Sequence, residues 1–316
     1  MSKDPQISII LPVYNDGDRV EGAIESVLQQ SFDSIELLIV NDGSTDHTSD
    51  TLEEYDDHPQ INIITHDENR GLPVALNTGL DYANGEYVMR QDSDDRSLPG
   101  RIRRQFKYHS NNPEIAVTTT GVEIIDEDDT VLYSMSGPEN PAPDLQSQNS
   151  VIHGATMIRR DAITDVGGYD EFFRFCQDYD LWVRLYREGH QIRTIQEPLY
   201  QLRRDSETLS VDRRRKIALY GLLARAPPAQ KQQLKDRAEK NGLESIYNGV
   251  SGEEKARYHQ RMALANIENR NRIGAVRQAL AGIKKNAFVP QSYAYLGVTL
   301  LPRSAADRVL NSVQGR

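Results

Sequence analysis

The stretch that decides the fold is Ile7-Ser8-Ile9-Ile10-Leu11-Pro12-Val13, which leads directly into the polar turn of residues 14–18. An almost continuously apolar run of this kind is typical of a strand buried on both faces of a parallel sheet. Further strands are predicted at residues 35–40, 61–65 and 86–90, with helical patterns between them. This alternation predicts right-handed βαβ units, and hence an α/β fold with a Rossmann-like, mostly parallel sheet flanked by helices.

Polar turns follow the first, second and fourth of these strands, at the edge where parallel sheets bind their ligands. The second turn begins with Asp42, and the fourth contains Asp92, Ser93 and Asp94. Two carboxylates one residue apart can share Mg²⁺ or Mn²⁺, which usually completes its coordination with water and substrate phosphate. Asp42 could accept a hydrogen bond from a ribose or a base. An NAD site is disfavoured because the first turn contains only Gly17, not a glycine-rich fingerprint.

Composition narrows the classes of protein that remain. The chain has 316 residues, a formal net charge of −10 and a single cysteine, Cys176. The charge argues against a nucleic-acid-binding protein, although Arg101, Arg103 and Arg104 are expected to form a local basic patch. One cysteine permits no internal disulfide, so a bound metal needs oxygen or histidine ligands. No apolar run approaches the ~20 residues of a spanning helix, and no leader precedes Ile7. We therefore expect a cytoplasmic protein whose membrane contact, at the inner face of the cell membrane, is peripheral.

The rest of the chain is expected to form a less regular middle region and a helical tail. In the middle we predict strands at 117–121, 151–158 and 199–203, a hairpin at 123–133, a loop at 138–148 and a helix at 178–188. In the tail we predict helices at 213–223, 229–241, 252–268, 273–285 and 305–313. The change of pattern places a domain boundary near residue 210, which gives domains of residues 1–210 and 211–316.

Several ordered motifs, taken together, strongly resemble the family 2 glycosyltransferases of the GT-A fold. They are residues 8–15 (SIILPVYN), 40–46 (VNDGSTD), 69–72 (NRGL), 91–95 (QDSDD), 153–155 (HGA), 167–170 (GGYD) and 177–182 (QDYDLW). The resemblance covers roughly residues 5 to 210, and the helical tail carries no family signal.

This resemblance implies an inverting, metal-dependent transfer of a sugar from a nucleoside diphosphate sugar to an acceptor hydroxyl. A UDP-sugar is the favoured donor, and the expected product is a cell-surface, lipid-linked or glycoprotein glycan. The implied nucleotide-sugar-binding residues are Pro12, Tyr14, Asp42, Arg70, Asp92, Ser93 and Arg204. Asp94, with Asp92, would hold Mg²⁺ or Mn²⁺, and Asp178 would be the catalytic base. His153 and Gly154 are expected on the acceptor side.

Asp178 is placed at the start of a predicted helix, where the helix dipole favours the ionised carboxylate that a base requires. A plain helix N-cap is the alternative role for this residue. Asp180 is expected to brace either the site or the helix, and Cys176 and Trp182 to pack in the interior. Gln177 replaces the glutamate that the family usually has before the base.

For three other candidate residues, a role that does not involve the substrate stays open. Arg70 could equally form a surface ion pair, and Arg204, where many relatives carry a histidine, could be solvated. His153 could be a structural histidine that is satisfied by its neighbours.

Two further classes of function stay open. One is a non-catalytic nucleotide-sugar-binding protein of the same fold, which the pair Asp92 and Asp94 together with Asp178 disfavours. The other is a nucleotidyltransferase, which would need a glycine-rich, basic first loop. The sugar, base, linkage, acceptor, oligomeric state and role of residues 211–316 are not determined by the sequence.

Overall fold

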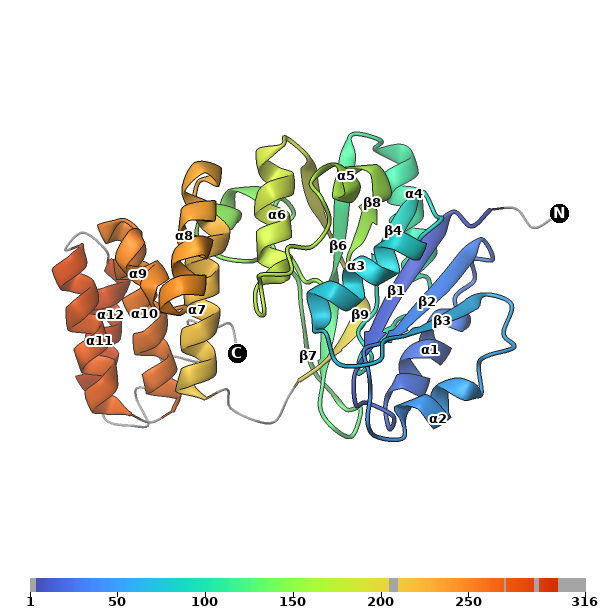
Figure 1. Ribbon diagram of the computed structural model, residues 1–316, viewed down its shortest axis with the longest axis horizontal. Helices are drawn as coiled ribbons and strands as arrows, with labels where there is room; N and C mark the ends of the chain where they lie inside the picture. Colours follow the sequence, from blue (N-terminus) through green and yellow to red (C-terminus); the bar gives the residue numbers. More distant parts are fainter. Residues whose placement is uncertain (1–3, 205–209, 270, 287–289, 301–316) are drawn as a thin grey trace. The chain divides into compact units, whose positions relative to one another are not determined.

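The structure, a computed structural model, describes residues 4–204, 210–269, 271–286 and 290–300 (Figure 1). The chain divides into two compact units, Met1–Ser206 and Glu207–Arg316. The first unit is an α/β domain, and the second is helical. The helix expected at 305–313 lies outside the described residues.

The first unit is built on a nine-stranded sheet of order β3-β2-β1-β4-β8-β6-β9-β5, with β7 paired to β6. The strands are β1 (Ile7–Val13), β2 (Ile35–Asn41), β3 (Ile61–Thr65), β4 (Tyr87–Arg90), β5 (Arg96–Ser97), β6 (Ile115–Ile125), β7 (Val131–Met135), β8 (Met157–Arg159) and β9 (Gln191–Arg203). Strands β3, β2, β1 and β4 are mutually parallel, and β6 is parallel to β9, whereas β8 and β5 run antiparallel to their neighbours. This confirms the mostly parallel sheet.

Helices flank the sheet because β1 is apolar on both faces (Figure 1). The helices of this unit are α1 (Val20–Leu28), α2 (Thr48–Glu53), α3 (Leu72–Tyr82), α4 (Arg101–Asn111), the 3-10 helix η1 (Ala142–Gln146), α5 (Arg160–Asp165) and α6 (Gln177–Arg187). Ile7, Ile9 and Leu11 share a core with the buried side chains of α1. Ile10 points to the other face and contacts α3, where a Cβ at Gly79 would lie 2.5 Å from the Ile10 side chain. Side chains of alternating direction thus fix helices on both faces.

The middle region departs from its sequence pattern in several places: β5, α4 and α5 were not predicted, and β9 begins at Gln191 instead of Leu199. The strand predicted at 151–158 is wrong, because only Met157–Arg159 forms β8. Residues 152–156 turn instead, with hydrogen bonds from Ala155 N to Ile152 O and from Thr156 N to His153 O. The hairpin is confirmed as β6 and β7, and the loop at 138–148 contains η1. The turn brings Gly154 to the carboxyl end of β4, next to Asp92.

The second unit is a set of packed helices. They are α7 (Val211–Arg225), α8 (Pro228–Asn241), α9 (Ser245–Gly249), α10 (Gly252–Glu268), α11 (Arg272–Lys285) and α12 (Pro290–Leu300). Four of the predicted helices are confirmed, whereas α9 and α12 were not predicted. A largely buried ion pair between Arg225 and Glu254, at 2.5 Å, links α7 to α10. In the described part of the chain, no helix combines the length and apolarity that crossing a bilayer requires.

Candidate active site

The polar turns at the carboxyl ends of β1, β2 and β4 are joined by side-chain hydrogen bonds. The Asn15 backbone adopts a left-handed conformation with φ of 52°. Its side-chain Oδ1 accepts a hydrogen bond from Thr45 N at 2.7 Å, which connects the first turn to the second. Ser93 Oγ donates to Asp16 Oδ2 at 2.6 Å, which connects the first turn to the fourth. The expected gathering of these turns at one edge is therefore present, and Asn15 and Asp16 hold it together.

Asp42 is buried directly after β2, and three protein donors already contact its carboxylate. Oδ1 contacts His66 Nδ1 at 2.7 Å and accepts the backbone N–H of Arg70 at 3.0 Å. Oδ2 accepts the backbone N–H of Gly71 at 2.8 Å. An ionised carboxylate offers about four acceptor positions. Asp42 therefore fixes the loop around Arg70 and keeps one position on Oδ2.

A buried arginine, Arg90, forms an ion pair with Asp92. The sequence analysis did not predict a role for this arginine. The Arg90 side chain is 1% exposed, and its guanidinium forms an ion pair with Asp92 Oδ1. The same guanidinium donates to the carbonyls of Ile10, at 3.0 Å, and Gln91, at 2.8 Å. A second buried arginine, Arg101, donates to the carbonyls of Arg90 and Gly154. The basic patch expected at Arg101 is therefore wrong for this residue, which lies in the interior beneath the acidic turn.

The acidic turn concentrates negative charge in a partly buried position. Burial, followed by the neighbouring charges of Asp92 and Asp16, raises the pKa of Asp94 to about 6. Burial, followed by Asp92 and Asp94, raises the pKa of Asp95 to about 8. Burial also raises the pKa of Asp16. These carboxyls resist simultaneous ionisation, and a cation placed among them would relieve that repulsion.

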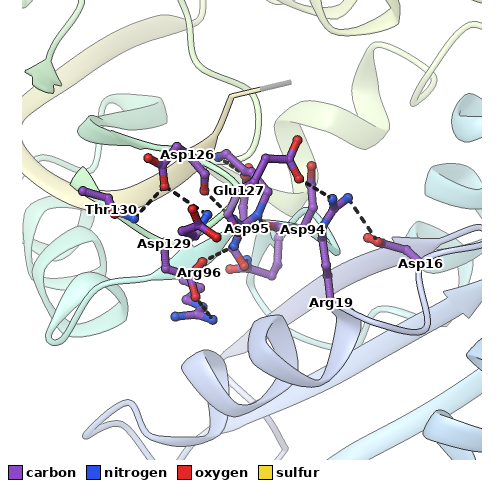
Figure 2. A network of polar contacts seen from close by, with 12 residues as sticks. Asp16, Arg19, Asp94, Asp95, Arg96, Asp126, Glu127, Asp129 and Thr130 are labelled. Carbon is purple, nitrogen blue, oxygen red and sulfur yellow. Dashed lines mark hydrogen bonds and ion pairs between the residues drawn. The ribbon is translucent and has the colours of Figure 1, made fainter. Parts of the chain in front are cut away.

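Arginines tie the acidic turn to the tip of the β6–β7 hairpin. Arg19 lies between Asp16, at 3.8 Å, and Glu127, at 3.0 Å (Figure 2). Arg203, the last residue of β9, donates its backbone N–H to Asp95 Oδ1 at 2.7 Å and its Nε–H to the Asp94 carbonyl at 3.1 Å. The Arg203 guanidinium also pairs with Asp129 of the hairpin. A polar cleft of about 390 Å³ opens between these groups and the first turn of α1.

Asp178 lies in the first turn of α6, half-buried. Its Oδ2 accepts a hydrogen bond from Asn149 Nδ2 at 2.7 Å. The Asn149 Oδ1 atom accepts the backbone N–H of Val151 at 3.1 Å, so the amide orientation is fixed. Burial raises the pKa of Asp178 despite the opposing hydrogen bonds from Tyr179 and Asn149. Burial therefore opposes the preference for the ionised form that we expect at the start of a helix. The N-cap alternative is wrong, because Cys176 occupies that position.

The remaining residues of the α6 motif have structural roles. Asp180 is buried and accepts a hydrogen bond from Arg184 Nε at 2.7 Å, which confirms that it braces the helix. Trp182 lies in the core, as expected. His153 contacts the Tyr169 hydroxyl at 2.8 Å through Nε2, and its ring packs against Trp182. Burial, followed by the charge of Arg90, lowers the pKa of His153 well below its usual value. These contacts favour the structural alternative for His153.

Gly154 lies so close to Asp92 and Tyr200 that only glycine fits at this position. A Cβ at this position would lie 2.5 Å from Asp92 Oδ2 and 2.6 Å from the Tyr200 hydroxyl. The Tyr200 hydroxyl in turn accepts the backbone N–H of Asp92 at 3.0 Å. Gly154 therefore belongs to the surroundings of the acidic turn.

The other predicted nucleotide-binding residues differ in exposure. Pro12 is buried within β1, opposite Val40, whereas the Tyr14 side chain is 46% exposed. Arg70 and Arg204 are both exposed. The Arg70 carbonyl accepts a hydrogen bond from Arg174 at 3.2 Å, and the Arg204 backbone N–H donates to the Ile125 carbonyl at 2.9 Å.

Sequence reasoning missed the residues that support the site. Arg90 gave a usable signal, since an arginine ends a strand that is otherwise buried, and such a charge needs a partner. Asp16 gave another, because it follows its strand as Asp42 and Asp92 follow theirs. Asn149 gave none, because it lies in a polar loop far from Asp178 in the sequence.

The donor set around Asp94 fits a hard divalent cation whose coordination is completed by substrate. Within the described residues, no group of three or more acidic, histidine or cysteine side chains could hold a metal by itself. Mg²⁺ and Mn²⁺ need only one or two carboxylates when phosphate oxygens and water supply the rest. Asp92 is already paired with Arg90, so Asp94 is the better placed of the two.

The sequence pattern of the family described as Glycosyl transferase family 2 matches residues 8–167. The chain belongs to glycosyltransferase family 2.

Curated relatives agree with this assignment. EpsE of Bacillus subtilis, provisionally assigned as a glycosyltransferase, is 33% identical over 216 residues, which cover 66% of this chain and 76% of EpsE. TuaG of the same organism, provisionally assigned to teichuronic acid biosynthesis, is 32% identical over 209 residues, which cover 65% of this chain and 82% of TuaG.

Solved structures share the fold. TarS 1-349 of S. aureus in complex with UDP has a TM-score of 0.58 and 18% identity, and the match covers 98% of this chain and 92% of that one. The mannosyltransferase PcManGT of Pyrobaculum calidifontis, in complex with GDP-Man and Mn²⁺, has a TM-score of 0.54 and 20% identity, covering 90% of this chain and 88% of that one. These likenesses confirm the GT-A fold.

Proposed function

We propose that the protein is an inverting, metal-dependent glycosyltransferase that uses a nucleoside diphosphate sugar, with a UDP-sugar favoured. The observation that carries this proposal is the gathering of the polar turns after β1, β2 and β4 at one edge of the sheet, where hydrogen bonds from Thr45 to Asn15 and from Ser93 to Asp16 join them. Burial raises the pKa of Asp178, on α6, and the charge of Asp92, after β4, adds to that shift. A base and an acidic diphosphate-binding turn in one region are what inversion requires, because the acceptor must attack opposite the leaving group.

On the donor side, the nucleotide would lie across the ends of β1 and β2. The exposed ring of Tyr14 would face the base, and Asp42 would use its remaining acceptor position on Oδ2 for a base N–H. Arg70 and Arg204, both exposed, would contribute positive charge toward the phosphates. Pro12, buried in β1, would set the floor beneath the base rather than contact solvent.

Asp94 would hold Mg²⁺ or Mn²⁺, with Asp92 and Asp16 contributing negative charge nearby. Such a cation neutralises charge that develops on the leaving diphosphate. The structure of a distant neighbour in complex with GDP-Man and Mn²⁺ supports this choice of ion.

Asp178 would remove the acceptor proton. Its raised pKa makes the ionised carboxylate a stronger proton acceptor than an exposed aspartate. Asn149 donates to Oδ2 and the Tyr179 backbone also hydrogen-bonds to this carboxylate, so an acceptor position that these donors leave would meet the acceptor hydroxyl. Gly154, on the acceptor side, would let the backbone of residues 153–155 approach Asp92 closely.

The acceptor would belong to a cell-surface, lipid-linked or glycoprotein glycan. The similarity to TuaG, whose name refers to teichuronic acid biosynthesis, supports the first of these.

Calorimetric titration of UDP, GDP, dTDP and CDP, each with and without Mn²⁺, tests the donor site. We expect one nucleotide to bind in a Mn²⁺-dependent manner, and Asp94→Ala to abolish that dependence. Asp81→Ala, which removes an exposed acid from α3, is the matched control and should bind as the wild type does. If the folded wild type binds none of the four nucleotides, the donor-site assignment is wrong.

A further inference from the structure

The charge of the chain is distributed unevenly along the sequence. The protein as a whole is acidic, with a formal net charge of −10. Between Glu268 and Asp307, however, the sequence contains six basic residues and no acidic one. They are Arg270, Arg272, Arg277, Lys284, Lys285 and Arg303. Helices α11 and α12 lie inside this stretch, so both are free of acidic side chains.

Helix α11 presents a mixed apolar and basic face to the outside. Its inner face is made of Ala275, Ala279 and Gly282, all buried. On the opposite face, Ile273 is 71% exposed and Leu280 is 51% exposed. Residues 277 and 284, also exposed, fall on the same stripe, because positions i, i+4, i+7 and i+11 align along a helix.

Helix α12, which packs against α11, adds an exposed aromatic side chain. Tyr293 is 49% exposed. Tyrosine suits the boundary between water and lipid, because its ring is apolar and its hydroxyl is polar. The four residues Ile273, Arg277, Leu280 and Lys284 are called the α11 face below.

We propose that the α11 face is a docking surface for an anionic lipid bilayer. The guanidinium and ammonium groups would meet lipid phosphates, while Ile273 and Leu280 would enter the boundary of the acyl chains. Long basic side chains reach past apolar neighbours to do this. The proposal goes beyond glycosyl transfer, since it assigns the helical unit a role of its own.

The small number of apolar side chains and the positive charge of this face favour a bilayer over a second protein. A stable protein interface buries about 800 Å² on each partner and is built around an apolar centre. Two separated apolar side chains, Ile273 and Leu280, alternate with two cations along α11 and do not form such a centre. A bilayer needs no matching shape, and each basic side chain near an anionic surface strengthens binding about five-fold.

Flotation of the 316-residue chain with lipid vesicles tests the proposal. We expect it to float with phosphatidylcholine vesicles that contain about 30 mol% phosphatidylglycerol and not with pure phosphatidylcholine. Binding should weaken on going from about 0.1 M to about 0.5 M salt, because screening shortens the range of the attraction.

Two double variants with the same change of net charge distinguish an effect of the α11 face from an effect of the overall charge of the protein. Arg277→Glu/Lys284→Glu should weaken binding to anionic vesicles by at least about 25-fold. Lys107→Glu/Lys240→Glu makes the same change of net charge at exposed positions on α4 and α8, and should bind nearly as the wild type does. Equal loss in both double variants, or no vesicle binding by the wild type, would overturn the proposal.

A spectroscopic variant reports on the face directly. The only tryptophan, Trp182, is buried in the first unit, so a second one at Leu280→Trp can be followed by its emission. A blue shift on adding anionic vesicles is expected. No shift, together with a dimer that Ile273→Ser/Leu280→Ser dissociates, would identify a second copy as the occupant instead. Nucleotide titration of the same variants keeps a failure of this proposal distinct from a failure of the donor site.

Discussion

Replacing Arg90 with methionine removes the buried cation beneath the acidic turn. The guanidinium is almost fully buried and forms the ion pair with Asp92 as well as two hydrogen bonds to carbonyls. Breaking a buried pair by removing one partner typically costs 3–5 kcal/mol, because the other charge is left uncompensated. Asp92 is 35% exposed, which lets water screen part of that charge. We therefore expect a loss of about 3 kcal/mol in the free energy of unfolding.

The double variant Arg90→Met/Asp92→Asn separates charge from packing. Removing both partners avoids the uncompensated carboxylate, so the double variant should be only about 1 kcal/mol less stable than wild type. Arg96→Met is the control, since its pair with Asp129 is about 40% exposed on both sides and should contribute less than about 1 kcal/mol.

Urea denaturation followed by Trp182 fluorescence measures these effects in metal-free protein. Because Trp182 is the only tryptophan and lies in the first unit, its signal reports on the catalytic unit. If Arg90→Met is as stable as wild type, or if the Arg90→Met and Asp92→Asn effects simply add, the reasoning about this ion pair is refuted.

Four further predictions concern the site itself. Asp178→Asn should lower the rate of transfer by about 10²–10⁴-fold while leaving the nucleotide dissociation constant unchanged, and a wild-type rate would exclude Asp178 as the base. Asn149→Ala removes a hydrogen bond that lowers the pKa of Asp178, so this pKa should rise further. The acidic limb of the pH–rate profile should then move to higher pH, and an unmoved limb would contradict this reasoning. The pKa of Asp95 is raised from 3.8 to about 8, so the folded state binds its proton more tightly than the unfolded state does. Metal-free protein should therefore lose stability as the pH rises from about 4 to about 8. In thermal melts, Asp95→Asn should make the stability depend less steeply on pH over this range. Gly154→Ala should weaken Mn²⁺-dependent nucleotide binding by about ten-fold or more in calorimetric titration, because the added Cβ would displace Asp92. An unchanged affinity would show that the turn adjusts to the added methyl group without displacing Asp92.

The sheet and the position of the site could be predicted because they rest on local patterns. The run from Ile7 to Val13 and the acidic turn after β4 are both visible in a few consecutive residues. Helix α6 was readable for the same reason, since Tyr179 and Trp182 mark one apolar face. The strand prediction for residues 151–158 was wrong because the tertiary contacts of Gly154 impose a turn on a segment whose sequence has the apolar pattern of a strand.

The environment of each carboxyl could not be predicted, because it depends on burial. Asp178 was expected to be favoured as an anion by its helix, yet burial outweighs the helix and raises its pKa. Arg101 looked like part of a surface patch, but its guanidinium lies over the buried Tyr200 ring at 4.5 Å. Partners such as Asn149 come from loops distant in the sequence, and no local signal identifies them.

The hydrogen bonds that join the polar turns bear on how donor specificity can be redesigned. A loop transplanted from a relative into the second turn alone would lose its contact with Asn15, and a new fourth turn without Ser93 would release Asp16. Libraries that vary one loop at a time would therefore be dominated by clones with disordered loops. Recombination that exchanges the first, second and fourth turns as one block should retain a higher fraction of folded, nucleotide-binding chimeras.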